Sequence, residues 1–388
     1  MHRNVQPVQH MLCPMAGRMT RRSAARTALL LGAIFPLFLA AIGSASARGD
    51  SPIPVAGGGG DGKDFYQKLQ RVTHFRNLRG LNVPAGVIQD LGRGDAERAV
   101  AALEALAAQG SRDANVALVR IQHWCGRLAS ARPTDIDTQI GKLTETLPPA
   151  RATRIAQVIR AEHEFRQHAG QACSRAAFDY RQIEARLREA ADLGDAASAT
   201  ELAQFVRDPA QRQALLKTAM DKGYAPAYYA IATQLLVAVQ RGETTENVGS
   251  IREWLKQAGR AVPKAKLDLA NCMALGCDGH PADALAAKAF GTDAARDGEP
   301  TAYLSMVRMP WGGRLSRSQL LAWQYFGDRL NEAGCMGDSY ASTSTMFAQT
   351  IGMLEKGQKP ATLQAARSQA DDLWNDFGAR AMRENGCD

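Results

Sequence analysis

The stretch FGTDAARDGEPTAYLSM, residues 290–306, decides how this chain of 388 residues folds. Gly298 stands at its centre, with Ala294 four residues before it, Ala302 four residues after it and Met306 eight residues after it. A glycine just past the end of a helix readily adopts the left-handed backbone conformation that terminates the helix. The alanines on both sides let the two joined helices approach closely. The stretch therefore predicts two closely packed helices with a tight turn between them.

The same spacing recurs along the chain. We call the residue at the glycine position the anchor of each copy. The other copies are Leu106-Gly110-Ala114-Leu118, Ala190-Gly194-Ser198-Leu202, Ala219-Gly223-Ala227-Ile231, Gln257-Ala261-Ala265-Leu269 and the degraded Leu330-Gly334-Asp338-Ser342. The last five anchors are separated by 29, 38, 37 and 36 residues. A period near 36 is typical of stacked helix–turn–helix units.

The rest of the chain from Asp64 onward also has helical periodicity. Apolar residues recur at intervals of three and four, and the breaks between such segments fall at glycine or proline. Large residues upstream of the anchors are expected to pack the second helix onto its neighbour; they are Leu215, Trp254, Phe290 and Phe326. We therefore predict an all-α fold of stacked helix–turn–helix repeats forming a solenoid. An alanine-rich bundle without true repeats is the alternative.

These copies resemble the Sel-one-like repeat, a relative of the tetratricopeptide repeat. The residues that carry the resemblance are Ala294, Ala295, Gly298 and Ala302 preceded by Phe290, and Leu275-Gly276 followed by Gly279 and Asp283, which is similar to the family's longer inter-helix loop. The resemblance covers about residues 185–340, and other copies lack the loop's paired glycines. It implies a right-handed superhelix whose concave face binds proteins or peptides, with no shared catalytic residues.

The N-terminal residues read as an export signal. Arg21, Arg22 and Arg26 precede an apolar run from Ala28 to Ile42, and Ala45-Ser46-Ala47 supplies a small-residue cleavage pattern. We expect cleavage after Ala47 and a periplasmic or secreted protein; a retained membrane anchor is the alternative. The predicted regions are a signal peptide at 1–47, a Pro/Gly linker at 48–63, a helical region with faint repeats at 64–180, the repeat array at 181–345 and C-terminal capping helices at 346–388.

Six cysteines remain after the predicted cleavage, an even number that suggests disulfides in an exported chain. Six cysteines allow about 15 connectivities. Our hypothesis is that sequence neighbours pair, which gives Cys125–Cys173, Cys272–Cys277 and Cys335–Cys387.

Charge and motifs exclude several functions. Residues 1–47 hold five arginines and no acidic residue, so the mature chain has a net charge of about +3, without the clustered basic face that nucleic-acid binding needs. His163 and His168 are five residues apart, which places them on different faces of a helix and argues against a zinc-protease site. Asp338 and Ser339 fit a helix cap better than a nucleophile. We predict no catalytic residue, cofactor or metal site.

A binding groove is the functional prediction. In stacked repeats the first helix of each unit lines the concave surface. Tyr228, Lys266 and Tyr303 lie beside the core column of that helix, with Tyr224, Tyr229 and Trp311 nearby. The alternative is that these residues serve packing. The expected partner is a protein or peptide, with no nucleic acid and no stable membrane insertion. The rival functions are an exported hydrolase with its site around residues 64–180, and an envelope assembly factor that recognises peptidoglycan or secretion machinery.

Overall fold

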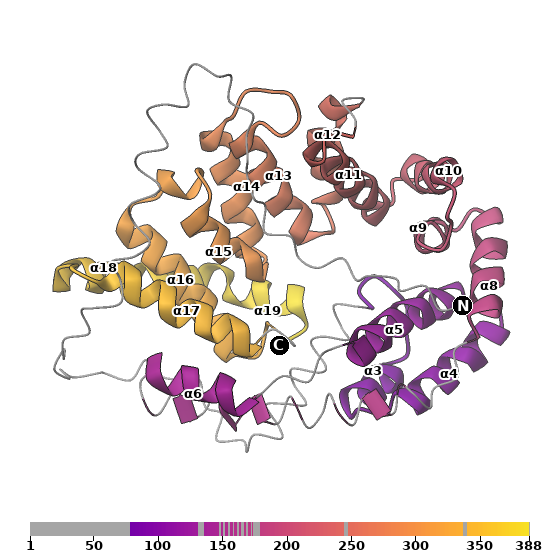
Figure 1. The fold of residues 1–388 in the computed structure, drawn as a ribbon, viewed down its shortest axis with the longest axis horizontal. Coiled ribbons are helices and arrows are strands. Elements are labelled where there is room, and N and C mark those ends of the chain that lie inside the picture. The colour runs from indigo at the N-terminus through magenta and orange to yellow at the C-terminus, as the bar shows by residue number, and fades with distance from the viewer. Residues whose placement is uncertain are drawn as a thin grey trace. The chain divides into compact units, whose positions relative to one another are not determined.

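The computed structural model of the chain describes residues 78–130, 136–146, 179–243, 247–336 and 340–387, with single positions between 149 and 173. Every regular element in these residues is a helix, and no strand occurs among them (Figure 1). The predicted signal peptide and linker, and the residues Asp338 and Ser339, lie outside the described residues. The prediction of an all-α fold is confirmed.

The helices are α3 (Ala85–Gly92), α4 (Ala96–Ala108), α5 (Arg112–Ser130), α6 (Ile136–Thr146), α8 (Tyr180–Asp192), α9 (Ala196–Leu202), α10 (Pro209–Asp221), α11 (Ala225–Gln240), α12 (Ile251–Ala258), α13 (Pro263–Leu275), α14 (Ala284–Arg296), α15 (Pro300–Arg308), α16 (Arg317–Glu332), α17 (Tyr340–Glu355), α18 (Pro360–Leu373) and α19 (Ala379–Asn385). Short 3₁₀ turns, η1 (Val248–Ser250) and η2 (Gly312–Arg314), and a π-helical segment, η4 (Trp374–Gly378), complete the described elements.

Packing follows the order of the helices in the chain. Consecutive helices contact one another from α8 through α17. Some helices that are two apart in the chain also contact each other, namely α9 and α11, α13 and α15, and α16 and α18. A stack of helix–turn–helix units buries its core in this way, because each unit can cover its apolar side only with its neighbours. The helical solenoid predicted from the sequence is therefore the observed architecture.

The turns at the glycine anchors have the predicted conformation. Gly223 and Gly298 have φ values of 73° and 75°, in the left-handed region. At the second turn the Gly298 N–H donates to Ala295 O at 3.0 Å and the Glu299 N–H donates to Ala294 O at 3.0 Å. These two bonds satisfy carbonyls at the end of α14 that the helix itself leaves without a partner.

The anchor at Ala261 makes a different turn. The N–H groups of Ala261 and Val262 both donate to Ala258 O, at 3.1 and 2.9 Å. Ala261 is not among the described residues with positive φ, a group that includes one non-glycine residue, Asn247. This turn therefore needs no glycine, which explains how the repeat spacing survives with alanine at the anchor.

The core consists of two clusters of buried side chains. The first runs from Leu78 to Ala227 and is largely aliphatic. The second runs from Ala232 to Cys387 and includes fully buried aromatic side chains, namely Tyr303, Trp311, Phe326 and Phe347. Both clusters take residues from α11, so the change between them falls inside that helix. The domain boundaries expected after residues 180 and 345 stay predictions.

The small-residue columns around the anchors lie in the core. Ala219, Ala227, Ala294 and Ala302 have no exposed surface. The aliphatic column eight residues after the anchors is buried at Leu202, Leu269 and Met306 and half-buried at Ile231. Close approach of the joined helices therefore depends on alanine, as the sequence predicts.

The six cysteines lie in three pairs at disulfide distance. Cys125 pairs with Cys173, Cys272 with Cys277 and Cys335 with Cys387, with Cα atoms 5.4, 4.9 and 5.2 Å apart. These separations fall within the range that disulfides require. The pairing is the neighbour-to-neighbour connectivity of our hypothesis.

None of the described helices combines the length and the apolar character needed to cross a bilayer.

Candidate functional site

The three residues of the predicted groove occupy one repeat position. Tyr228, Lys266 and Tyr303 each lie five residues after an anchor, on α11, α13 and α15. The structure places all three against neighbouring helices, where their polar atoms bond to other parts of the same chain.

The two tyrosines bridge the helices that meet at each glycine turn. The Tyr303 hydroxyl donates to Ala295 O at 2.8 Å, and the Tyr228 hydroxyl donates to Met220 O at 2.8 Å. Each acceptor lies three residues before its anchor, at the end of a helix where carbonyls lack intrahelical partners. Tyr228 is half-buried and Tyr303 is fully buried. The prediction that Tyr303 lines a binding groove is wrong. Its side chain is fully buried, and its hydroxyl donates to a carbonyl at the end of the preceding helix.

Lys266 belongs to a partly buried charge cluster. Its Nζ donates to Asp293 Oδ2 at 2.6 Å and to Asp297 Oδ2 at 2.7 Å, and its side chain is 18% exposed. Arg380 Nη2 of α19 lies 2.5 Å from Asp297 Oδ1. Burial lowers the pKa of Lys266, but the hydrogen bonds and charges of Asp293 and Asp297 outweigh burial and raise its pKa above the usual value. Lys266 therefore ties α13 to α14 instead of facing a ligand.

The other aromatic residues near the predicted groove also have internal partners. Trp311 is fully buried and its Nε1–H donates to Asn271 Oδ1 at 3.0 Å. The Tyr229 hydroxyl donates to Asp268 Oδ2 at 2.8 Å, and Lys264 Nζ donates to Asp268 Oδ1 at 2.7 Å. Burial followed by the charge of Asp268 raises the pKa of Tyr229.

A different set of positions faces outward on the same three helices. On α13 the outward positions lie 3, 7, 10 and 14 residues after the anchor, which is the spacing of one helix face. Equivalent positions recur on α11 and α15. We call this set the stripe surface; it consists of Val237, Lys264, Asp268, Asn271, Leu275, Thr301 and Arg308. The exposed fraction is 42% for Val237 and 36% for Leu275.

Asn271 is the best-oriented polar group of the stripe surface. The Trp311 indole N–H can only donate, so the Asn271 oxygen must face it. The amide Nδ2 then points away from Trp311 with two N–H donors, and no described residue accepts a hydrogen bond from it. Sequence reasoning singled out the position five after the anchor and missed this one. The available signal was the polar residues at 3, 7 and 10 after the anchor on α13 and α15, a pattern that α11 lacks at Pro226 and Ala230.

Among the described residues the titratable groups with shifted pKa values lie in separate places, except that Lys266 and Arg79 both interact with Asp297. Burial raises the pKa of Tyr224, just before α11, and of Tyr325 on α16, and the Glu355 carboxylate adds to the shift at Tyr325. Burial lowers the pKa of Arg79, while the charge of Asp297 opposes this change. Each shift follows from burial and partners within the chain. In this part of the chain no three His, Cys, Asp or Glu side chains form a group suited to a metal ion.

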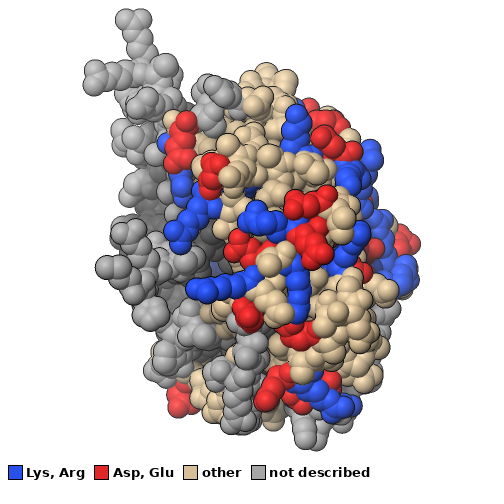
Figure 2. Space-filling model, turned by 90° about the vertical axis from the view of Figure 1, so that its right-hand side faces the viewer, with Lys and Arg blue, Asp and Glu red and all other residues tan. Residues whose placement is uncertain are grey.

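Charged side chains of both signs are interspersed on the face of the molecule drawn in Figure 2. Ion pairs also join helices; Arg186 Nη1 of α8 lies 2.6 Å from Glu104 Oε2 of α4. A surface of mixed sign attracts polyanions far less than a surface of one sign does.

Comparison with known proteins identifies a solved structure to which the chain is similar. No protein-family model matches the chain, and no curated protein matches it. Among solved structures, the chain is similar to c5321, a protective antigen present in uropathogenic Escherichia coli strains that displays an SLR fold. The sequence identity is 14%, the match covers 83% of this chain and 87% of that chain, and the TM-score is 0.33. The assignment of an all-α repeat fold rests on the helices and turns of this chain itself.

Proposed function

We propose that this chain is an exported helical-repeat protein that acts as a protein- or peptide-binding scaffold in the cell envelope. The observation that carries the proposal is the stripe surface, which three neighbouring helices present at equivalent repeat positions. Repeat arrays bind partners along such surfaces because each unit adds one more contact in register.

The chemistry of the stripe surface suits an extended peptide segment. Asn271 offers amide donors of fixed orientation, which suit a main-chain carbonyl. Val237 and Leu275 offer exposed apolar contacts, and Lys264 and Asp268 offer one charge of each sign. Fixed donors beside apolar positions are the combination through which peptide grooves obtain both affinity and specificity.

Export is supported by the three cysteine pairs. Disulfides form and persist in oxidising compartments and are rare in the cytosol. Together with the signal peptide predicted at 1–47, the pairs support a periplasmic or secreted location. Sequencing the N-terminus of the mature protein tests this part of the proposal; we expect it to begin at Arg48.

The experiment that tests binding is in-cell crosslinking of the exported protein, followed by affinity capture and mass spectrometry. The informative variant is Val237→Glu/Leu275→Glu, which places charge on the stripe surface at side chains that the core does not need. The matched control is Leu285→Glu on α14, where the leucine is 70% exposed. We expect a small set of envelope proteins with the natural chain and the control, and at least a tenfold loss with the double variant.

The outcome that contradicts the proposal is equal recovery by all three chains or an empty capture at native expression. Recovery of one fixed complex, unaffected by the double variant, favours an assembly factor. An empty capture favours the exported-hydrolase alternative, which a hydrolase screen of the purified chain then tests.

A further inference from the structure

The C-terminal helix α19 covers a turn whose counterpart at Gly223 is open. It lies over the turn between α14 and α15, where a Cβ atom added to Gly298 would lie 2.4 Å from Asn385 Nδ2 and 3.3 Å from the Ala381 Cβ. At the equivalent turn, a Cβ atom added to Gly223 would meet nothing within 4 Å. At the Gly194 turn the Lys222 side chain occupies this place, so cover by another helix distinguishes the Gly298 turn from these two.

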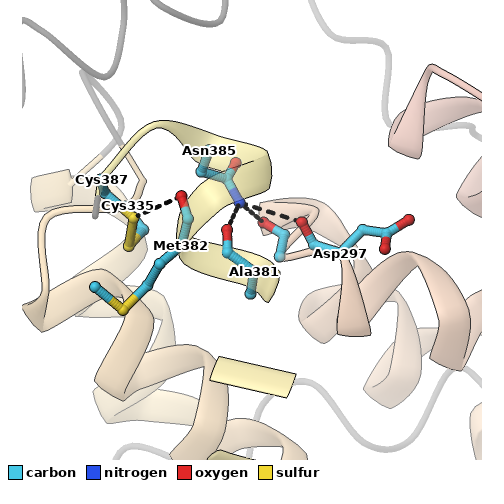
Figure 3. The surroundings of a disulfide bond; sticks show 7 residues. Asp297, Cys335, Ala381, Met382, Asn385 and Cys387 are labelled. Atoms are coloured by element: carbon cyan, nitrogen blue, oxygen red, sulfur yellow. Dashed lines mark hydrogen bonds between the residues drawn. A yellow bond between two sulfur atoms is a disulfide. The ribbon is translucent and has the colours of Figure 1, made fainter. Parts of the chain in front are cut away.

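Most contacts between α19 and this turn are polar. Figure 3 shows the Asn385 side chain directed from α19 towards backbone carbonyls of the turn. Its Nδ2 donates to Asp297 O at 3.2 Å, and Arg380 Nη2 lies 2.5 Å from Asp297 Oδ1. Glu384 forms an ion pair with Arg79. Such contacts exchange for contacts with water at small net cost, unlike buried apolar surface.

The apolar contribution of α19 is small. Ala381 is the buried apolar residue of this helix, Met382 packs half-buried against the core cluster, and Cys387 is buried just beyond the helix end. By contrast, α16 buries Leu321, Trp323, Phe326 and Leu330. The strongest tie of α19 to the rest of the chain is its disulfide, Cys335–Cys387.

A π-helical segment, η4, directly precedes α19. The segment η4 is the single π-helical segment among the described residues, and π-helical turns often mark functional positions. Its first residue, Trp374, is anchored on α16, because its ring packs on Phe326 with ring centroids 6.1 Å apart and the Arg329 guanidinium lies 4.1 Å from its centroid. The segment ends at Gly378, where α19 begins. The segment η4 therefore joins the part of the C-terminus that packs on α16 to the helix α19, whose contacts with the Gly298 turn are mostly polar.

We propose that α19 is a redox-released cap, held over the Gly298 turn by the Cys335–Cys387 disulfide and free to pivot at η4 when that bond is reduced. The reductant is a dithiol. One of its thiolates attacks a disulfide sulfur and displaces the other cysteine as thiolate; its second thiol then closes to the cyclic disulfide, leaving Cys335 and Cys387 as thiols. Two electrons and two protons pass to the protein. Both sulfurs are buried, so the attack occurs from a locally opened state of α19.

Release changes one end of the scaffold. It uncovers the turn that leads directly into α15, whose Thr301 belongs to the stripe surface. It also frees the Cys387 thiol on a short C-terminal tail. The inference concerns the cap alone and holds whether or not the stripe surface binds a peptide.

Hydrogen-exchange mass spectrometry on the full mature chain tests the cap. The variant Cys335→Ser/Cys387→Ser removes its tie, and Cys272→Ser/Cys277→Ser is the control, because it removes a disulfide from the same core cluster without touching α19. We expect residues 379–387 to exchange at least tenfold faster in the first variant and in the dithiothreitol-reduced natural chain. The helices α16 and α18 should keep their protection, and the control should leave α19 protected.

Two results of the hydrogen-exchange experiment would contradict the proposal that α19 is released on reduction. One is unchanged protection of α19 after loss of its disulfide, which would mean that its other contacts suffice. The other is loss of protection throughout residues 317–387, or failure of the variant to fold, which would make the disulfide a general staple of the core. Alkylation of Cys387 in the partly reduced natural chain supplies a second measurement, and modification slower than that of Cys277 would also count against release.

Discussion

The turns at Gly223 and Gly298 have nearly the same sequence pattern and different surroundings. Both glycines are left-handed, and a tyrosine five residues later donates to the carbonyl three residues before each glycine. Gly223 is exposed and Tyr228 half-buried, whereas Gly298 and Tyr303 are buried. Gly298 is covered by α19, whose Asn385 lies 88 residues after Asp297, whereas the Tyr303 ring is buried against Phe326 of α16 and Phe347 of α17.

The tyrosine five residues after the anchor makes the same hydrogen bond in both copies but differs in its exposure. The internal role of the position, which joins two helices across a turn, is the same in both copies. How far the side chain at this position is exposed depends on the helices that pack over it, and these lie outside the copy itself. A groove predicted by repeat position alone therefore selects residues whose exposure differs from copy to copy.

Removing the Cys335–Cys387 disulfide, which holds α19 over Gly298, should make the Gly298 turn as open as the Gly223 turn. This change also has the largest expected effect on stability. In the chain-entropy model, loss of Cys335–Cys387, which joins residues 52 positions apart, costs about 4 kcal/mol of unfolding free energy. Loss of Cys272–Cys277, which closes a much shorter loop, costs about 2 kcal/mol. Urea unfolding of the two double serine variants measures both costs, and equal costs would contradict the estimate.

Adding a methyl group at each glycine compares the two turns directly. Gly223→Ala forces alanine into the left-handed region and should cost about 1 kcal/mol. Gly298→Ala has the same backbone cost and also displaces Asn385, so we expect about 3 kcal/mol. In the Cys335→Ser/Cys387→Ser background the two costs should become equal. A persistent difference there would mean that α19 stays in place without its disulfide.

The turn at Ala261 extends the comparison, because its position five after the anchor is a lysine. Lys266→Met leaves the buried Asp297 carboxylate with one cation fewer and should cost about 2 kcal/mol at neutral pH, less than for a fully buried pair. The folded-state pKa of Lys266 is raised above its ordinary value of 10.5. The stabilisation is therefore fully present below pH 10.5 and is lost as the pH rises through the folded-state pKa.

Unfolding free energies of the natural chain and Lys266→Met measured between pH 8 and 12 check this sign. The two curves should converge at the alkaline end. A difference that grows with pH would contradict the pairing of Lys266 with Asp293 and Asp297.

Removing the tyrosine hydroxyls gives the smallest effects. Tyr303→Phe removes a buried hydrogen bond and should cost about 1 kcal/mol, while Tyr228→Phe should cost about 0.5 kcal/mol, because water reaches the half-buried site. Thermal unfolding of both variants measures the difference. A larger cost at Tyr228 would mean that burial does not set the strength of these bonds.

The sequence by itself determined the local architecture of this protein. Glycine at Gly298 predicted the left-handed turn, because no other residue adopts that backbone conformation as readily. Alanines such as Ala294 and Ala302 predicted close helix packing, because a small side chain is what close approach requires. Cysteine order suggested the three pairs, since neighbours in a stacked array are near in space.

Only the tertiary structure decided which side chains face outward. Tyr303 and Lys266 were expected in a groove, yet one hydroxyl turns to a carbonyl of the preceding helix and one ammonium to two carboxylates of the next. The periodicity of a helix states which residues share a face but not what packs over that face. Phe326 and Phe347 pack against Tyr303, and Arg380 of α19 contacts Asp297, the partner of Lys266; the spacing within a repeat contains no information about either contact.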